Sequence, residues 1–300
     1  MSETIDSKKD SDKTNLLISV NTEEKCQTYF TMFGKKRRFP AGENAAGFII
    51  TSFLILIPSG IYVILTFTLA CSKIPSIPDL INKVSNTPFI IFGIVSIITL
   101  CFCMMAFFDV STSIPGYQTG KKVSFAEFQK KQPTLTIGNS TFILKYCQTC
   151  NIIRDIRTFH CKFCNMCVER HDHHCGYVSN CIGKNNLSKF FYFLFICFTH
   201  IAFVEITSVY MIVVSCSIGE DDSLSLFTVF FGILCVFVGF FFVFLIVMIG
   251  QHTFLISSNR TTNEDIRRKY DYTVYNKGCL NNWKEVCCTK DKQDEYEFEI

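Results

Sequence analysis

Four long apolar runs divide the sequence. They cover residues 47–70, 88–108, 190–214 and 226–249, and no lysine or arginine lies in the interior of any of them. Each run is close to the ~20 residues that a helix needs to cross the hydrocarbon core of a bilayer. The pattern predicts four transmembrane helices, the first of them kinked at Pro58, where neighbouring helices can satisfy the freed backbone groups.

The composition agrees with this pattern. Hydrophobic residues make up 49% of the 300 residues and charged residues only 18%, with 32 phenylalanines. Such a chain is too apolar for an ordinary soluble protein. The formal net charge of +3 gives no indication of a nucleic-acid partner. We therefore expect an integral membrane protein that does not bind nucleic acid.

The basic residues indicate the topology. Lysine and arginine concentrate in residues 1–46, 109–189 and 250–300, whereas the connectors 71–87 and 215–225 hold two and none. The positive-inside rule then places both termini and the central segment in the cytosol, and the two connectors in the lumen or outside the cell. The sequence does not distinguish an endomembrane such as the endoplasmic reticulum or Golgi from the plasma membrane.

The N-terminal arm, residues 1–46, is predicted to be largely disordered. Its first 31 residues are polar and mixed in charge, without a sustained period. Four basic residues in a row, 35–38, lie shortly before the first apolar run. They are either a solvated charge run or a cytoplasmic anchor at the membrane surface, and their position favours the anchor.

The cytosolic segment contains a dense cluster of possible metal ligands. About 45 residues rarely fold without metal or disulfides, and Cys-x-x-Cys spacings on a reducing side of a membrane indicate metal. A structural zinc ion takes four ligands. Two zinc sites would use eight of the eleven candidates and leave three, while one zinc with several free thiols is the alternative. The candidates are Cys147, Cys150, His160, Cys161, Cys164, Cys167, His171, His173, His174, Cys175 and Cys181.

One tetrapeptide in this cluster carries the side chains of a catalytic group. Asp172, His173, His174 and Cys175 follow one another directly. A nucleophilic cysteine needs a histidine as base and a carboxylate that orients the histidine. This short stretch supplies all three types of side chain.

The whole segment resembles the cysteine-rich domain of the DHHC-type protein S-acyltransferases, or palmitoyltransferases. The frame C-x2-C-x9-HC-x2-C-x2-C-x4-DHHC-x5-C runs from Cys147 to Cys181. Downstream, residues 261–264 (TTNE) resemble the TTxE motif of the family, and residues 275–286 resemble its C-terminal conserved segment. The resemblance covers most of residues 47–286.

The resemblance implies an all-α four-helix transmembrane bundle with a small cytosolic two-zinc domain, about 145–190, between the second and third spans. It implies Cys175 as nucleophile, His173 as base and Asp172 as the partner that orients the base. The implied ligands of the first zinc are Cys147, Cys150, His160 and Cys167. Those of the second zinc are Cys161, Cys164, His174 and Cys181.

The resemblance also implies a reaction. Cys175 takes a long-chain acyl group, palmitoyl by the family name, from acyl-CoA and passes it to membrane-proximal cysteines of other proteins. The alternative is a catalytically weak or inactive, zinc-stabilised membrane adaptor. The intact Asp172, His173 and Cys175 favour the enzyme, whereas residues 176–177, Gly-Tyr in place of the usual Pro-Trp, point the other way.

Four residues are candidates for contact with acyl-CoA. Arg154 and Arg157 either meet the phosphates of CoA or form a solvated basic edge that faces anionic lipid. Tyr177 retains an aromatic ring next to the nucleophile. His200 lies ten residues into the third span, where it either lines or closes an acyl cavity among the helices or is a neutral imidazole bonded to a neighbouring helix.

The C-terminal motif suggests a supporting role. We expect Thr262 and Glu264 to brace the active site, and Tyr275, Asn282 and Trp283 to dock the tail against the helices. Ordinary capping or amphipathic packing is the alternative for each of them.

Overall fold

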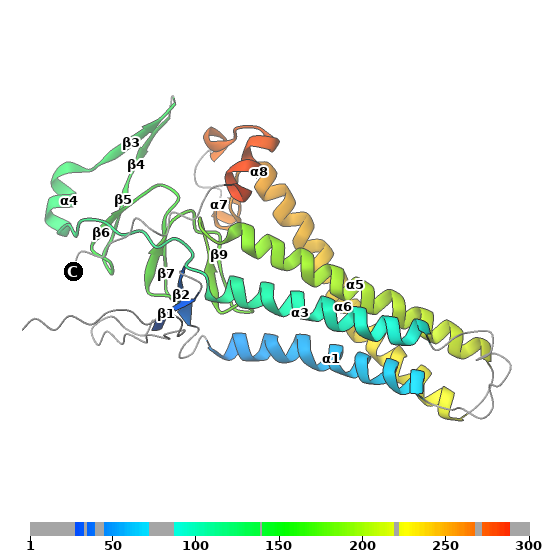
Figure 1. The fold of residues 1–300 in the computed structure, drawn as a ribbon. Coiled ribbons are helices and arrows are strands. Elements are labelled where there is room, and N and C mark those ends of the chain that lie inside the picture. Colours follow the sequence, from blue (N-terminus) through cyan, green and yellow to red (C-terminus); the bar gives the residue numbers. More distant parts are fainter. Residues whose placement is uncertain are drawn as a thin grey trace, which may run out of the picture.

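The computed structural model is a bundle of four long helices with a Cys/His-rich module at one end (Figure 1). It describes residues 28–32, 35–39, 45–71, 87–138, 140–218, 222–267 and 272–288. All four helices are long and apolar enough to cross a membrane, and the module lies between the second and the third. The predicted fold class is confirmed. The helices are α1 (Ala45–Cys71), α3 (Thr87–Thr112), α5 (Leu187–Ile218) and α6 (Asp222–Ser257).

Helix α5 is the centre of the bundle. It packs against α6 and α3, while α1 packs mainly against α3. Polar side chains join the helices within the apolar core, as in the 2.6 Å hydrogen bond between the hydroxyls of Tyr62 and Thr207. Such bonds satisfy groups that have no water to bind at this depth.

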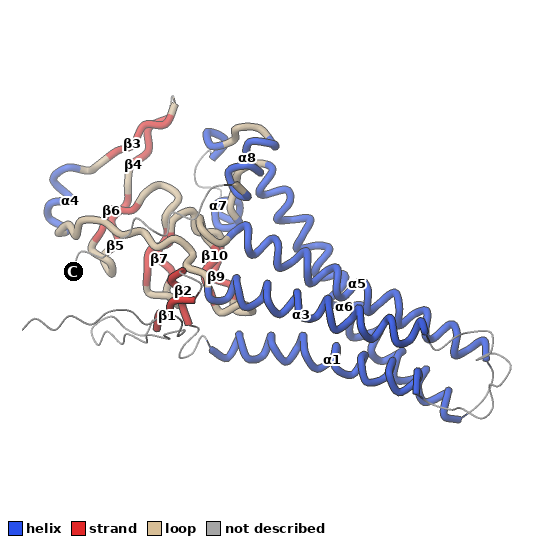
Figure 2. The backbone as a smooth tube through the Cα atoms, in the orientation of Figure 1, coloured by secondary structure: helices blue, strands red, loops and turns tan. Residues whose placement is uncertain are grey.

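Short hairpins build the Cys/His-rich module (Figure 2). In each of three antiparallel pairs a turn reverses the chain, so that residues a few positions apart in the sequence face each other. His160 lies opposite Cys167, and His174 lies opposite Cys181. The pairs are β5 (Lys145–Cys147) with β6 (Ile152–Arg154), β7 (Phe159–Cys161) with β8 (Met166–Val168), and β9 (His173–Cys175) with β10 (Asn180–Ile182).

Before the module, the chain forms a short helix and a further hairpin that extend away from the bundle (Figure 1). Helix α4 (Phe125–Lys131) begins at a capping box, in which the Ser124 side chain and Glu127 bond each other's backbone N–H groups. Strands β3 (Thr134–Ile137) and β4 (Ser140–Ile143) follow as an antiparallel pair.

The N-terminal arm contains structure that the sequence did not predict. Strands β1 (Thr28–Met32) and β2 (Lys35–Phe39) pair antiparallel within the segment that we expected to be largely disordered. Arg37 forms an ion pair with Asp109 on α3, and Arg38 is buried inside the protein. Two of the four basic residues proposed as a membrane anchor, Arg37 and Arg38, therefore point into the fold. Residues 1–27, residues 72–86 and 219–221 of the two connectors, and residues 289–300 lie outside the described residues.

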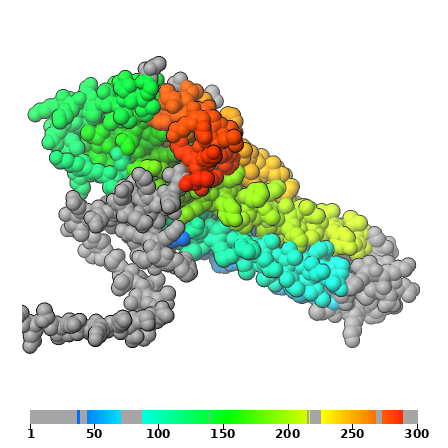
Figure 3. Space-filling view, turned by 45° about the horizontal axis from the view of Figure 1, so that its top comes forward, coloured from blue at the N-terminus to red at the C-terminus, as the bar shows by residue number. Residues whose placement is uncertain are grey.

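The C-terminal segment folds back onto the module and the near ends of α5 and α6 (Figure 3). It contains α7 (Thr262–Arg267), the 3-10 helix η2 (Tyr272–Tyr275) and α8 (Cys279–Cys287). Asn282 is buried and donates a 2.7 Å hydrogen bond to the carbonyl of Ser257, while Trp283 donates to the Ser257 hydroxyl at 3.0 Å. The tail thus docks on the last residue of α6.

Candidate active site

Strand β9 explains how the predicted catalytic and metal-binding side chains can alternate along the chain. Successive residues of a strand point to opposite faces. His174 faces Cys181 across the hairpin and points toward other cysteines, whereas His173 and Cys175 share the opposite face. That face borders an apolar cavity among the helices. One strand of three residues therefore serves both the metal-binding group and the reactive group.

The Asp172 carboxylate is held from several sides. Its Oδ2 accepts a 2.6 Å hydrogen bond from Nδ1 of His173 and a 2.8 Å bond from the hydroxyl of Thr262. Its Oδ1 accepts a 2.7 Å bond from the backbone N–H of Thr262. The carboxylate is only 2% exposed, so these bonds replace the water that it gives up on burial. Thr262 thus contacts the predicted catalytic group directly.

This arrangement shifts the pKa values of Asp172 and His173 in opposite directions. Burial raises the pKa of Asp172, but the hydrogen bonds from His173 and its positive charge, with His252 nearby, lower that pKa well below its usual range. Burial lowers the pKa of His173, but its bonds to Asp172 and Cys175 raise the pKa to about 9. The pair therefore exists as a carboxylate beside an imidazole that readily holds a proton.

Cys175 lies where this pair meets the cavity. Its side chain is 8% exposed. Burial raises the pKa of the thiol, but His173 and the backbone N–H groups of Tyr177 and Val178 lower it below the usual value. A thiol with a lowered pKa supplies more thiolate, which is the nucleophilic form. The geometry suits covalent catalysis by Cys175 with His173 as base.

Two Cys3His groups in the module could each hold a metal ion. In each group the four donor atoms lie within 4.8 Å of one another. Nδ1 of His174, for example, lies 3.6, 3.5 and 3.6 Å from the sulfurs of Cys161, Cys164 and Cys181. Donors at ~2.0–2.3 Å from a tetrahedral ion are separated by similar distances, so the donor sets fit zinc. The first group is Cys147, Cys150, His160 and Cys167, and the second is Cys161, Cys164, His174 and Cys181.

Arg38 borders the second group from outside. It is 3% exposed, and its Nη1 lies 3.2 Å from the sulfur of Cys164 and 3.0 Å from Oδ1 of Asn180. With a divalent ion bound, three thiolates would leave excess negative charge, and this guanidinium is placed to balance it. The sequence showed Arg38 only as part of a charge run.

His171, which had no role in the sequence analysis, lies beside the same group. Its Nε2 is 3.8 Å from the sulfur of Cys181, and its ring packs near Phe159. Burial lowers the pKa of His171 to about 4. The side chain is therefore a neutral neighbour of the metal-binding cysteines.

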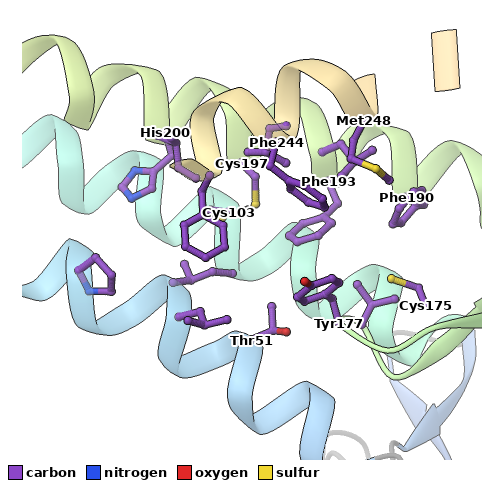
Figure 4. Close-up of a pocket in the computed structure, with 18 of the residues that line it drawn as sticks. Thr51, Cys103, Cys175, Tyr177, Phe190, Phe193, Cys197, His200, Phe244 and Met248 are labelled. Carbon is purple, nitrogen blue, oxygen red and sulfur yellow. Dashed lines mark hydrogen bonds between the residues drawn. The ribbon is translucent and has the colours of Figure 1, made fainter. Parts of the chain in front are cut away.

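The cavity extends from Cys175 into the bundle (Figure 4). It has a volume of about 370 Å³ and a lining that is almost entirely apolar. His200 lies at the end far from Cys175 (Figure 4), where its ring nitrogens are 2.9 Å from the Ser59 hydroxyl and 2.8 Å from the Thr99 hydroxyl. The side chain joins α1, α3 and α5. Both sequence alternatives for His200 describe part of this arrangement, because it lines the cavity and bonds neighbouring helices.

Of the other three residues predicted to contact acyl-CoA, one lines the cavity and two do not. Tyr177 lines the cavity next to the nucleophile, with its ring centroid 6.3 Å from that of Phe244. Neither Arg154 nor Arg157 lines the cavity. Arg157 instead forms two hydrogen bonds of 2.6 and 2.8 Å with the Glu264 carboxylate. Glu264 is thus joined to the module, as the bracing role requires.

Two further residues near the site, Asn259 and His252, were missed. Asn259 binds both Arg157 and Arg170 through its Oδ1, at 3.0 and 2.9 Å. His252 lies near Asp172 on the last turns of α6. Only the burial of polar residues around the motif could have indicated them, and a single sequence does not show burial.

The fold and the site define a class of protein. The chain is a multi-pass membrane protein whose Cys/His-rich module carries two possible metal sites and an Asp–His–Cys group at an apolar cavity. Residues 140–269 match the family model for DHHC palmitoyltransferase. This match covers the module, the last two helices and the start of the C-terminal segment, and it confirms the resemblance to the DHHC palmitoyltransferase family.

Curated relatives match about half of the chain or somewhat more. Palmitoyltransferase ZDHHC8 of Mus musculus is 36% identical over 149 residues, which are 49% of this chain and 19% of the relative. Palmitoyltransferase ZDHHC5 of Rattus norvegicus is 36% identical over 158 residues, 52% of this chain and 22% of the relative. Protein S-acyltransferase 8 of Arabidopsis thaliana is 29% identical over 190 residues, 60% of this chain and 45% of the relative. The chain thus spans less than half the length of each of these relatives.

Proposed function

We propose that this protein is a membrane-bound protein S-acyltransferase. It transfers a long-chain acyl group, such as palmitoyl, from acyl-CoA to cysteines of proteins at the membrane. One observation carries the proposal: a thiol with an adjacent His–Asp pair opens onto an apolar cavity within the bundle. The polar thioester can thus meet the nucleophile while the acyl chain enters the cavity.

In the first step His173 accepts the thiol proton of Cys175, and the sulfur attacks the carbonyl carbon of the acyl-CoA thioester. The bond between that carbon and the sulfur of CoA breaks. CoA leaves as a thiolate and takes the proton from His173. Asp172 keeps the ring of His173 oriented and stabilises its positive charge. The product is an acyl-enzyme with a thioester at Cys175.

In the second step a cysteine of the protein substrate repeats the chemistry in reverse. Its thiol gives a proton to His173, its sulfur attacks the acyl carbon, and Cys175 leaves as a thiolate that takes the proton back. One thioester replaces another, so no oxidant or other co-reactant is needed. The substrate cysteine must lie close to the membrane surface to reach Cys175.

We infer that each Cys3His group holds one zinc ion, which cross-links a module too small to fold around an apolar core. Because each group supplies four protein ligands, zinc has a structural part and no place in the transfer.

For the phosphates of CoA, Arg154 is the better of the two predicted candidates, since Arg157 already donates two hydrogen bonds to the Glu264 carboxylate. The concentration of basic residues in the segments at this end supports a cytosolic position for the module.

A labelling experiment tests the proposal. Purified full-length protein in detergent is incubated with labelled palmitoyl-CoA, and label that hydroxylamine removes is measured. Wild type should be labelled, Cys175→Ser should not, and Cys101→Ser should behave as wild type, because Cys101 is exposed on α3 away from the cavity. An unlabelled wild type, or a Cys175→Ser protein that labels equally, would support the adaptor alternative instead.

A second measurement tests the zinc assignment. Elemental analysis should find two zinc ions per chain, one for each Cys3His group. Cys161→Ser should lose bound zinc and misfold, since removing a structural ligand removes folding free energy. A soluble Cys161→Ser protein that retains the full zinc content would contradict the ligand set.

A further inference from the structure

His252 occupies a buried position directly behind the catalytic pair. It lies on the last turns of α6, is 2% exposed, and its Nε2 is 3.7 Å from Oδ2 of Asp172. Asp172 is therefore flanked by two imidazoles, His173 from its own strand and His252 from the membrane helix. The proposed reaction as written above uses only His173.

The hydrogen bonds of His252 fix one of its protons. Its Nδ1 lies 2.9 Å from the carbonyl oxygen of Met248. A carbonyl only accepts, so Nδ1 carries a hydrogen. The other ring nitrogen, Nε2, is the edge of His252 that faces Oδ2 of Asp172, at 3.7 Å.

No other group competes for this nitrogen. Among the described residues, Nε2 of His252 has no hydrogen-bond partner, although the side chain is almost completely buried. Ring packing keeps it in place, with the Phe190 centroid at 5.2 Å and the His173 centroid at 6.1 Å. A buried, unpartnered nitrogen that is held against a carboxylate indicates an electrostatic role.

The Asp172 carboxylate needs such support. Its Oδ2 already accepts two hydrogen bonds, from His173 and Thr262. His252 at 3.7 Å therefore acts through a longer electrostatic contact rather than through a third short bond. The other ionisable groups near Asp172 are Arg170 and His171, but Arg170 is bonded to Asn259 and Glu285.

We propose that His252 is a positioning residue for acyl transfer, which holds the Asp172 carboxylate from the membrane side and so fixes the orientation of His173. This inference rests on the proposed acyltransferase function. His252 also binds the carbonyl of Met248, whose side chain lines the cavity. The same helix turn therefore connects the cavity wall with the catalytic pair.

Variants of His252 separate this role from packing. His252→Phe keeps a ring against Phe190 without any nitrogen, and His252→Met keeps similar volume in a flexible side chain. His252→Gln retains an N–H donor that can reach the carboxylate. Thr253→Val is the matched control, because Thr253 is exposed and bonds only the Ile249 carbonyl of its own helix.

Two rates are measured in the full-length protein. The first is alkylation of Cys175 by iodoacetamide without acyl-CoA, followed by mass spectrometry of the peptide that contains Cys175. The second is formation of the acyl-enzyme as a function of palmitoyl-CoA concentration. Both should fall about tenfold in His252→Phe and His252→Met, at unchanged KM for palmitoyl-CoA. His252→Gln should recover most of the loss, and Thr253→Val should match wild type.

Three results would overturn the proposal. Wild-type rates in both donor-free variants would show that the imidazole is not needed. A change in KM alone would make His252 part of the cavity wall. A metal ion bound in addition to those of the two Cys3His groups and lost on substitution would make Asp172, His173 and His252, whose donor atoms lie within 4.8 Å of one another, a metal site. If wild type forms no acyl-enzyme, the acyltransferase function fails, while the alkylation rates still report on His252.

Discussion

The start of helix α1 touches the peptide that follows the nucleophile. Gly47 lies in the first turn of α1, and the space where a Cβ atom would lie is already occupied. That atom would be 1.9 Å from the carbonyl oxygen of Gly176 and 2.9 Å from the hydroxyl of Ser179. Because Gly176 directly follows Cys175, Gly47→Ala tests how tightly the nucleophile must be held.

The size of the perturbation follows from these distances. A contact of 1.9 Å is about 1.5 Å short of the 3.4 Å at which ordinary van der Waals contact begins. The obstacle is a backbone carbonyl, so either the loop 176–179 or the end of α1 must move by about that amount. Overpacking of this kind costs about 1–3 kcal/mol. A misplacement of about 1 Å at a reacting group can lower a rate about 100-fold.

We therefore expect Gly47→Ala to form the acyl-enzyme about 100-fold more slowly than wild type. The assay is the time course of hydroxylamine-sensitive label from palmitoyl-CoA, with zinc content and thermal stability measured in the same preparation. Gly60→Ala is the matched control. Gly60 is also in α1, but nothing lies within 4 Å of its added Cβ, so this variant receives the same gain in helix propensity without the clash.

The zinc measurement separates the possible causes of a slow variant. The clash falls on the loop 176–179, which contains none of the residues of the Cys3His groups, so Gly47→Ala should retain zinc. If Gly47→Ala and Gly60→Ala formed the acyl-enzyme at the same rate, the close contact between α1 and the loop would have no part in positioning Cys175. That result would refute the reasoning.

Three further predictions concern the supports around the site. Thr262→Val removes the 2.8 Å hydrogen bond to Oδ2 of Asp172 and should slow acyl-enzyme formation about tenfold at unchanged zinc content; an unchanged rate would contradict the bracing role. Arg38→Gln removes the cation beside the sulfur of Cys164, so a competing chelator should extract zinc about tenfold more readily, and equal extraction from both proteins would contradict this role. His200→Ala opens the far end of the cavity and should shift the preference among acyl-CoAs toward longer chains, whereas an unchanged preference in a competition assay would place the end of the acyl chain elsewhere.

The sequence predicted the membrane helices well because each is a long uninterrupted apolar run. Their ends were harder to predict. The last run was ended at residue 249, whereas α6 continues to Ser257. The added residues include polar side chains that interrupt the apolar pattern, although the backbone remains helical. His252 is one of them, and its partner Asp172 is 80 positions earlier in the chain, so periodicity alone could not connect the two.

The basic cluster before α1 illustrates the limit of charge patterns. Four adjacent cations predicted a surface anchor, but Arg37 reaches Asp109 and Arg38 reaches Asn180. Those partners come from α3 and β10, 72 and 142 positions away in the sequence. A cation is buried only where the fold brings a partner, and a local pattern carries no information on such distant partners.

The grouping of the Cys and His side chains was easier to predict than the position of the arginines proposed for the CoA phosphates. Fixed Cys-x-x-Cys spacings place donor atoms together within short hairpins. The spacing in the sequence therefore almost determines the distance between the donor atoms. Arg157 has no such constraint. Its guanidinium could face solvent, CoA or protein, and a carboxylate 107 positions away, that of Glu264, takes it. Sequence reasoning is most reliable where the chain itself limits the distance.

The position of Asp172 shows why the catalytic group depends on the whole fold. Its neighbour His173 comes from β9, Thr262 reaches it from the C-terminal segment, and His252 approaches from α6. On the same strand, His174 belongs to the second metal-binding group. A shift of the module relative to α6 or to the tail would therefore disturb the carboxylate before it disturbed any metal ligand. Metal ions in the two Cys3His groups would tie the module into one unit, and the helix and tail would then determine whether that unit holds His173 in the orientation that Cys175 needs.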